Sequence, residues 1–246
     1  MLKGKNALIT GSNRGIGRAL VEAFANNGAS LWAHARCESA EFIDDMSRIA
    51  EKHSVLIRPV FFDMTDLTTM KMTIKQIAST SASLDILVNN AGVAHGGFLQ
   101  MTPVATIRQV FEINYFSQLE LMQLVSRLMS RQKFGSIVNI ASISGLDLHA
   151  GNTAYGVSKS ALIAATKILG AEFAGLGIRV NAVAPGLTDT DMAKQMEEKA
   201  GRAMIESSAM KRAAHAAEIA AAVVFLASDR ASFINGQVVR VDGGSI

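Results

Sequence analysis

Short apolar runs alternate regularly with longer amphipathic segments along this 246-residue chain, and this pattern restricts its fold more than any other feature. Continuous apolar runs are typical of strands covered on both faces, and the segments between them have helical periodicity. The alternation predicts an α/β fold: a doubly wound parallel sheet of about seven strands with helices on both faces. The expected strands are 6–10, 30–35, 55–62, 86–89, 136–140, 179–184 and 238–241, and the expected helices are 16–27, 41–52, 66–77, 103–132, 155–174 and 219–226.

Composition narrows the class of protein. Hydrophobic residues make up 49% and charged residues 18% of the chain, which suits a globular protein with a large core. The net charge is only +3 without a block of like charges, so we expect no nucleic-acid partner. No apolar run is long enough to span a bilayer, and the N-terminus lacks a signal-peptide pattern. Cys37 is the single cysteine, so a disulfide within the chain is excluded and a cytoplasmic location is expected.

No linker or repeat interrupts the pattern, so we expect residues 1–246 to form one domain. Two expected helical stretches, 119–129 and 161–169, are apolar on more than one face. A helix of this kind needs a partner on both sides, and the sheet supplies only one. The alternatives are deep burial within the monomer and a subunit interface. We favour the interface, which predicts a homotetramer or a homodimer.

The first expected strand runs into a glycine-rich turn, Thr10–Gly17, that opens the first helix. Glycines permit tight turning, and a helix N-terminus offers free N–H groups and a positive dipole end to a phosphate. The spacing is G-x-x-x-G-x-G rather than the common dinucleotide fingerprint, and glycine turns also serve plain chain reversal. Its place at the first strand–helix junction favours a nucleotide. The expected contacts are Gly11, Ser12, Asn13, Arg14, Ile16 and Gly17.

The end of the second strand bears on the choice between NAD and NADP. An acidic residue there would bind the ribose hydroxyls and repel a 2′-phosphate. Here His34-Ala35-Arg36-Cys37 brings no acid before Glu38, and the guanidinium groups of Arg36 and Arg14 suit a phosphate. The alternative is two solvated arginines. We expect NADP(H) to be preferred, with NAD(H) possible. After the third strand, Asp63 could bind the adenine or cap a turn, and Met64 is expected beside it.

Tyr155 and Lys159 are four residues apart in an expected helix, with Ser142 thirteen residues upstream. Side chains at i and i+4 share one helix face. Lowering the pKa of a phenol from about 10 to about 7 takes roughly 4 kcal/mol. One ammonium about 4–5 Å away supplies roughly that much at an effective dielectric near 20. Such a pair could pass a proton to a carbonyl, although the pattern is common by chance. No metal site is predicted.

Several motifs in a fixed order resemble those of the short-chain dehydrogenase/reductase family, in its single-domain Rossmann-type branch. They are the Thr10–Gly17 turn, Asn89-Asn90-Ala91-Gly92, Asn114, Ser142, Tyr155-x-x-x-Lys159 and Pro185-Gly186. Among its members the chain is most similar to bacterial 3-oxoacyl-[acyl-carrier-protein] reductases. The resemblance covers essentially the whole chain.

The resemblance implies an oxidoreductase and a role for each matching residue. Tyr155 would be the general acid in reduction, and Ser142 would hydrogen-bond the substrate carbonyl. Lys159 would hold the nicotinamide ribose and lower the pKa of Tyr155, and Asn114 would position a water next to Lys159. The remaining implied cofactor contacts are Asn90, Ala91 and Gly92 after the fourth strand, and Pro185, Gly186, Thr188 and Thr190 after the sixth.

The substrate pocket is expected from residues 93–101, 149–153 and 187–208. The last segment would form a lid with Met192, Met196 and Met204 on its inner face, and His95 and His149 could meet a polar substrate. The reaction implied is reduction of a ketone to a secondary alcohol, with a 3-oxoacyl thioester or another small carbonyl as substrate. Lys133 matches a carrier-protein contact of the family, whereas Leu176 replaces the other basic residue. A non-catalytic NADP(H) sensor and a sugar-nucleotide epimerase are the weaker alternatives.

Overall fold

The computed structural model describes residues 1–80, 83–194 and 198–245. Its centre is a seven-stranded sheet in the order β3-β2-β1-β4-β5-β6-β7, and every neighbouring pair is parallel. The strands are β1 Asn6–Ile9, β2 Ser30–Ala35, β3 Ile57–Phe61, β4 Ile86–Asn89, β5 Gly135–Ile140, β6 Ile178–Pro185 and β7 Val238–Val241. The chain changes direction across the sheet between β1 and β4, where doubly wound sheets bind their ligands.

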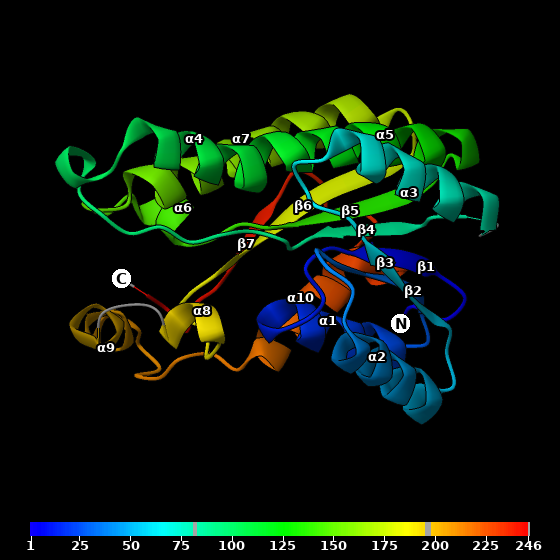
Figure 1. The fold of residues 1–246 in the computed structure, drawn as a ribbon, viewed down its shortest axis with the longest axis horizontal. Coiled ribbons are helices and arrows are strands. Elements are labelled where there is room, and N and C mark those ends of the chain that lie inside the picture. Colours follow the sequence, from blue (N-terminus) through cyan, green and yellow to red (C-terminus); the bar gives the residue numbers. More distant parts are fainter. Residues whose placement is uncertain (81–82, 195–197, 246) are drawn as a thin grey trace.

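Helices cover both faces of the sheet (Figure 1). One face carries α1 Gly15–Asn26, α2 Ala40–His53 and α10 Ala216–Ala227; the other carries α3 Leu67–Thr80, α4 Val104–Phe111, α5 Ser117–Gln132 and α7 Thr153–Ala174. The other described helices are α6 Ser144–Asp147, α8 Asp191–Lys194 and α9 Glu198–Ser207, with single turns at Leu99–Met101, Glu112–Phe116 and Asp229–Ala231. The described helices include none with the length and apolar character needed to cross a bilayer.

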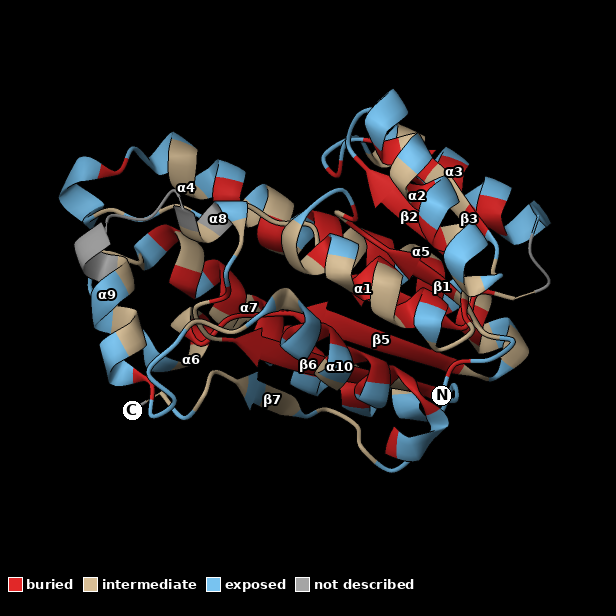
Figure 2. Cartoon of the chain, turned by 90° about the horizontal axis from the view of Figure 1, so that it is seen from below, coloured by how far each residue is buried: buried red, intermediate tan, exposed pale blue. Residues whose placement is uncertain are grey.

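Two apolar cores hold these layers together because successive strand residues point to opposite faces. Ala7 and Ile9 pack with α1, α2 and α10, whereas Leu8 between them packs with α3 and α5. Figure 2 shows the central strands almost wholly buried and the outer faces of the helices exposed. Each large side chain buried completely, such as Phe24, contributes about 1.5–3 kcal/mol to folding.

The expected fold class is confirmed, and the expected helix 103–132 is wrong in one respect. It is divided by a π-helical turn, Glu112–Phe116, between α4 and α5. Asn114 lies in this turn, and its side chain binds the backbone of Val93 on the neighbouring segment. An apolar period of 3.6 cannot reveal one wider turn, and such turns often occur at functional sites. The four-residue α6 was missed for a related reason, since it is too short to show a period.

Candidate active site

A cavity of about 1030 Å³ opens at the carboxyl ends of the strands. Its walls come from the segments that follow β1 to β6, which the sequence placed at this edge of the sheet. Of the twenty different residues expected to act in catalysis or cofactor binding, the cavity is lined by all except Ser12 and Asn114. The structure therefore brings together chain segments that are up to about 180 residues apart, as parallel strand order requires.

The glycine turn is closely packed against itself and against the end of β4. A Cβ on Gly17 would lie 1.8 Å from the Gly11 carbonyl oxygen, and Gly11 itself has a φ of 67°. The Asn90 side chain donates hydrogen bonds to the carbonyl oxygens of Thr10 and Gly11 at 2.9 and 3.0 Å. Position 17 therefore has room only for glycine. Asn90 contributes by holding the backbone of the glycine turn in place through these two hydrogen bonds.

The N-terminus of α1 is suited to an anion. The preceding residue, Arg14, makes no side-chain cap of the helix, whereas Ser39 caps α2 through the N–H of Phe42. Arg14, Gly15, Ile16 and Gly17 all line the cavity. Uncapped N–H groups and the positive end of the helix dipole are the features that bind pyrophosphates.

His34 is a buried contact of the glycine turn that our reading of the sequence did not single out. Its Nδ1 accepts the N–H of Gly11 at 3.1 Å, so Nε2 carries the proton and donates to the Phe62 carbonyl at 2.8 Å. Burial lowers the pKa of His34 to about 4, which keeps the ring neutral. No sequence signal marked this residue, because it reads as part of an apolar strand.

The backbone N–H of Ser12 donates to the His34 carbonyl oxygen in β2, and the Ser12 hydroxyl donates to the Ile9 carbonyl oxygen. Ser12 is fully buried and does not line the cavity. It therefore supports the turn from behind. The N–H groups of Gly11 and Ser12 both donate to His34, so neither is free for a ligand.

Arg36, Cys37, Asp63 and Met64 line the part of the cavity beyond β2 and β3. Within the described residues, neither Arg36 nor Arg14 takes part in a salt bridge. Asp63 caps a turn: its Oδ1 accepts both the N–H and the hydroxyl of Thr65 at 2.8 Å, and these bonds lower its pKa. Asp63 therefore caps a turn, which was one of its two expected roles. It also lines the cavity, where an adenine could reach it.

Ser142, Tyr155 and Lys159 meet in the middle of the cavity. Ser142 hydrogen-bonds Tyr155, and both side chains line the opening. Lys159 is only 4% exposed. Its Nζ donates to the Ile140 carbonyl at 2.8 Å and lies 5.9 Å from the centre of the Tyr155 ring. This arrangement places a hydroxyl, a phenol and an ammonium around one small volume.

The sequence predicted that Lys159 lowers the pKa of Tyr155, whereas in the structure this pKa is raised. Burial raises the pKa of Tyr155, and the Ser142 hydrogen bond opposes this rise. Burial also lowers the pKa of Lys159, to about 8. The reason is distance and desolvation: the ammonium is bound to a main-chain oxygen, and both groups have lost their water.

Asn114 lies behind the cavity wall. Its Oδ1 accepts the Val93 N–H at 2.9 Å, and its Nδ2 donates to the Val93 carbonyl at 2.9 Å and to Ser158 at 3.1 Å. A Cβ on Gly92 would lie 3.1 Å from Asn114 Oδ1 and 3.5 Å from Lys159 Nζ. The residue thus holds the Gly92–Val93 backbone near the lysine, while its role toward a water stays a prediction.

The end of β6 and the segment that follows it line the cavity beside the glycine turn. Pro185, Gly186, Thr188 and Thr190 line it, as expected. A Cβ on Gly15 would lie 3.2 Å from the Thr190 methyl group, so the two segments nearly touch.

The remaining wall is mixed in character. It includes His95, Gln109, Glu112, Asn152 and Met204. Phe98, Leu99, Met101 and His149 do not line the cavity, and the first three are well exposed. Met196 and the side chain of Met192 lie outside the described part of the chain.

An open-ended cavity with an uncapped helix N-terminus and a phenol–lysine pair defines a nucleotide-dependent oxidoreductase site. A family model described as enoyl-(acyl carrier protein) reductase matches residues 11–245. The chain is 35% identical to the 3-oxoacyl-[acyl-carrier-protein] reductase of Thermotoga maritima over 245 residues, covering 100% of this chain and 99% of that protein. The corresponding enzyme of Escherichia coli is 35% identical over 243 residues, covering 98% and 97%.

Solved structures agree. Levodione reductase superposes with a TM-score of 0.93 at 29% identity, over 99% of this chain and 98% of that one. A structure described as a putative short-chain alcohol dehydrogenase from Sinorhizobium meliloti gives 0.92 at 32% identity, over 100% and 98%. The chain belongs to the short-chain dehydrogenase/reductase family. It is accordingly an oxidoreductase that uses NAD(P) in the interconversion of carbonyl and alcohol.

Proposed function

We propose that the protein is an NADP(H)-dependent reductase that converts a ketone to a secondary alcohol. The observation that carries this proposal is the meeting of Ser142, Tyr155 and Lys159 in the same cavity as the uncapped N-terminus of α1. The nicotinamide cofactor supplies the hydride when bound. Arg14–Gly17, Asn90–Gly92 and Pro185–Thr190 would hold it.

The protein's own groups handle the proton and the developing charge. The Ser142 hydroxyl and the Tyr155 hydroxyl both donate to the substrate oxygen, and Tyr155 gives up its proton as charge develops there. Lys159, with a pKa of about 8, is mostly charged at neutral pH. A charged ammonium beside the ring stabilises the phenolate that proton transfer leaves. Lys159 also binds the cofactor ribose in this proposal, and Asn114 holds the water that serves it.

Preference for NADP(H) over NAD(H) is part of the proposal and rests on Arg36 and Arg14. Replacing Arg36 by Asp removes a guanidinium and introduces an acid that a ribose hydroxyl can use. We expect the ratio of kcat/KM for NADPH over NADH to fall by about tenfold to a hundredfold, since a charged hydrogen bond contributes about 1.5–3 kcal/mol. Arg131→Asp on the outer face of α5 is the control. An unchanged ratio in Arg36→Asp would defeat the phosphate assignment.

Cys37 offers a readout of cofactor placement that needs no turnover. It is the only cysteine, is exposed, and lines the cavity next to Arg36. NADPH should slow its reaction with a thiol reagent in the wild type, and NADPH should protect much less in Arg36→Asp. Equal protection in both proteins would place the 2′-phosphate elsewhere.

For the substrate we favour a 3-oxoacyl thioester, supported by the full-length similarity to 3-oxoacyl-[acyl-carrier-protein] reductases. Leu176 is 42% exposed where the resemblance implied a basic residue, which favours a thioester free of a carrier protein. Another small carbonyl (a sugar, a quinone or a diketone) is the alternative, supported by neighbours described as a gluconate dehydrogenase and as levodione reductase. NADPH oxidation measured with acetoacetyl thioesters, carrier-bound thioesters, diketones and quinones tests the choice. If NADPH is oxidised with none of these compounds, the alternative of a non-catalytic NADP(H) sensor is favoured instead.

We also propose that residues 1–246 form a single domain and that four copies of the chain associate as a homotetramer. Phe116 on the π turn and Val157 and Ile168 on α7 are 49%, 45% and 58% exposed, and their burial between subunits would favour association. Sedimentation at micromolar concentration should give four times the 26.1 kDa subunit mass. Ile168→Glu should shift it to smaller species, because a charge in a buried interface lacks a partner. A monomeric wild type would contradict this.

The segment 187–208 is proposed as the wall against which the substrate binds, with Leu187, Ala193 and Met204 among its described apolar contacts. Part of this segment, 195–197, lies outside the described residues. The cytoplasmic location expected from the single cysteine stays a prediction.

A further inference from the structure

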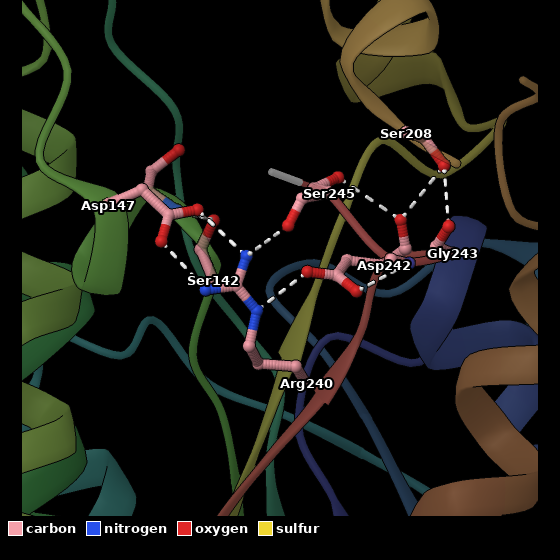
Figure 3. A network of polar contacts seen from close by, with 9 residues as sticks. Ser142, Asp147, Ser208, Arg240, Asp242, Gly243 and Ser245 are labelled. Atoms are coloured by element: carbon pink, nitrogen blue, oxygen red, sulfur yellow. Dashed lines mark hydrogen bonds and ion pairs between the residues drawn. The ribbon is translucent and has the colours of Figure 1, made fainter. Parts of the chain in front are cut away.

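Arg240 lies in β7, one residue before the strand ends, and its guanidinium holds two carboxylates at once (Figure 3). Two of its nitrogens donate to the two oxygens of Asp147 at 2.7 and 2.9 Å, and Nε donates to Asp242 at 2.7 Å. The Arg240, Asp147 and Asp242 side chains are 37%, 26% and 7% exposed. A planar fork of this kind fixes direction as well as distance.

Asp147 lies in the segment 142–152, which we call the first wall because its residues Ser142, Ser144 and Asn152 line the cavity. It ends α6, five residues after Ser142. The next residue, Leu148, is 62% exposed and has a φ of 53°, a conformation that leucine rarely adopts. Such a residue persists only where its neighbours hold the backbone. The wall continues to Asn152, which lines the cavity and pairs with Gly97.

Asp242 holds the opposite wall, which we call the second wall, residues 204–210. Its carbonyl oxygen and that of Gly243 accept the Ser208 hydroxyl at 3.2 and 3.0 Å. The backbone N–H groups of Ala209 and Met210 donate to Gly244 and Gly243, each at 3.1 Å. Ser208 directly follows α9, whose Met204 lines the cavity. Movement of Asp242 would therefore move the end of α9.

We propose that Arg240 is a positioning residue that sets the separation of the two walls on the substrate side of the cavity. Without its guanidinium, the carboxylates of Asp147 and Asp242 face each other with like charge and no shared cation. The walls would then separate, carrying Ser142 and Asn152 away from Met204. Arg240 is not among the cavity-lining residues, so it acts through these two anchors. The kinetic consequence rests on the proposed function; the structural one does not.

Arg240→Met tests the structural consequence by amide hydrogen exchange. We expect exchange in both 144–152 and 204–210 to become roughly fivefold faster or more, because local opening follows the loss of tertiary contacts. Arg18→Met is the matched control: Arg18 forms a similar two-pronged pair with Asp45, at 2.7 and 3.0 Å, between α1 and α2. It should leave both walls unchanged. Arg240→Lys, which keeps the charge and loses the fork, should be intermediate.

A second substitution separates repulsion from a general loss of packing. Asp147→Asn in the Arg240→Met background removes the like charge and should restore part of the exchange protection, which a purely structural defect would not allow. Unchanged exchange in either wall of Arg240→Met, or no restoration by Asp147→Asn, overturns the proposal.

Kinetics test the assignment to the substrate side. The KM for the ketone should rise at least roughly fivefold in Arg240→Met, while the dissociation constant of NADPH changes less than about twofold, since the hydrogen bonds of Arg240 reach neither the glycine turn nor the N-terminus of α1. An equal rise for both ligands would overturn the assignment. If the wild type reduces no carbonyl, the proposed function fails, and the exchange measurements still decide the role of Arg240.

Discussion

Tyr155→Phe should reduce kcat/KM for carbonyl reduction by about a hundredfold to ten-thousandfold, the usual contribution of a positioned general acid. The substitution removes one oxygen atom, and with it both the proton to be transferred and the hydrogen bond to Ser142. The aromatic ring stays, so the packing around Lys159 should change little. NADPH affinity, measured by fluorescence titration, should remain within a few-fold of the wild type.

Tyr115→Phe is the matched control, because the chain has only two tyrosines. Tyr115 packs edge-on against Phe116, with ring centres 5.2 Å apart, and does not line the cavity. Its loss should leave reduction nearly unchanged. If Tyr155→Phe retained a tenth of the activity, Tyr155 would not be the proton donor.

Gly17→Ala should weaken NADPH binding by about fivefold to a hundredfold, since overpacking at a rigid contact costs about 1–3 kcal/mol. The added carbon would lie 1.8 Å from the Gly11 carbonyl oxygen and 2.6 Å from the Asn90 amide nitrogen. Both are held in place: Gly11 by His34, and Asn90 by its bonds to the turn. Relief therefore requires the turn to open, which displaces the N-terminus of α1. Isothermal titration and the loss of NADPH protection at Cys37 measure the effect.

Gly175→Ala separates this effect from the general cost of replacing a glycine. Gly175 ends α7 with a φ of −65°, and a Cβ there would meet nothing within 4 Å. Its replacement should leave NADPH binding unchanged and should stabilise the fold slightly, if at all. NADPH affinity of Gly17→Ala within twofold of the wild type would mean that the turn is softer than its contacts imply.

Much of the site could be predicted because parallel strands end at one edge of the sheet. The glycine turn, Asn90 and Ser142 each follow a different strand, and Pro185 ends another, so the parallel arrangement of the strands gathers them. Tyr155 and Lys159 join them through helical spacing within one helix. The boundaries of β2 and β4 were also predicted residue for residue, because each is an apolar run bounded by polar or turn residues.

Other features have no local signal. The π turn at Asn114 arises from bonds to Val93, twenty-one residues earlier. His34 meets Gly11 only because β2 lies beside β1, and Arg240 meets Asp147 across 93 residues. Neither pair has a pattern that an apolar period or a motif could reveal.

The positions of the strands along the chain, their apolar character, the glycine turn and the helical spacing of Tyr155 and Lys159 followed from the sequence by itself, since each depends on neighbours within a few residues. The proton affinities of Tyr155, Lys159 and His34, and the pairs that join the walls of the cavity, were decided only by the tertiary structure. The physical reason is that desolvation and long-range hydrogen bonds depend on which distant segments come together around a group, and packing of the whole chain determines that.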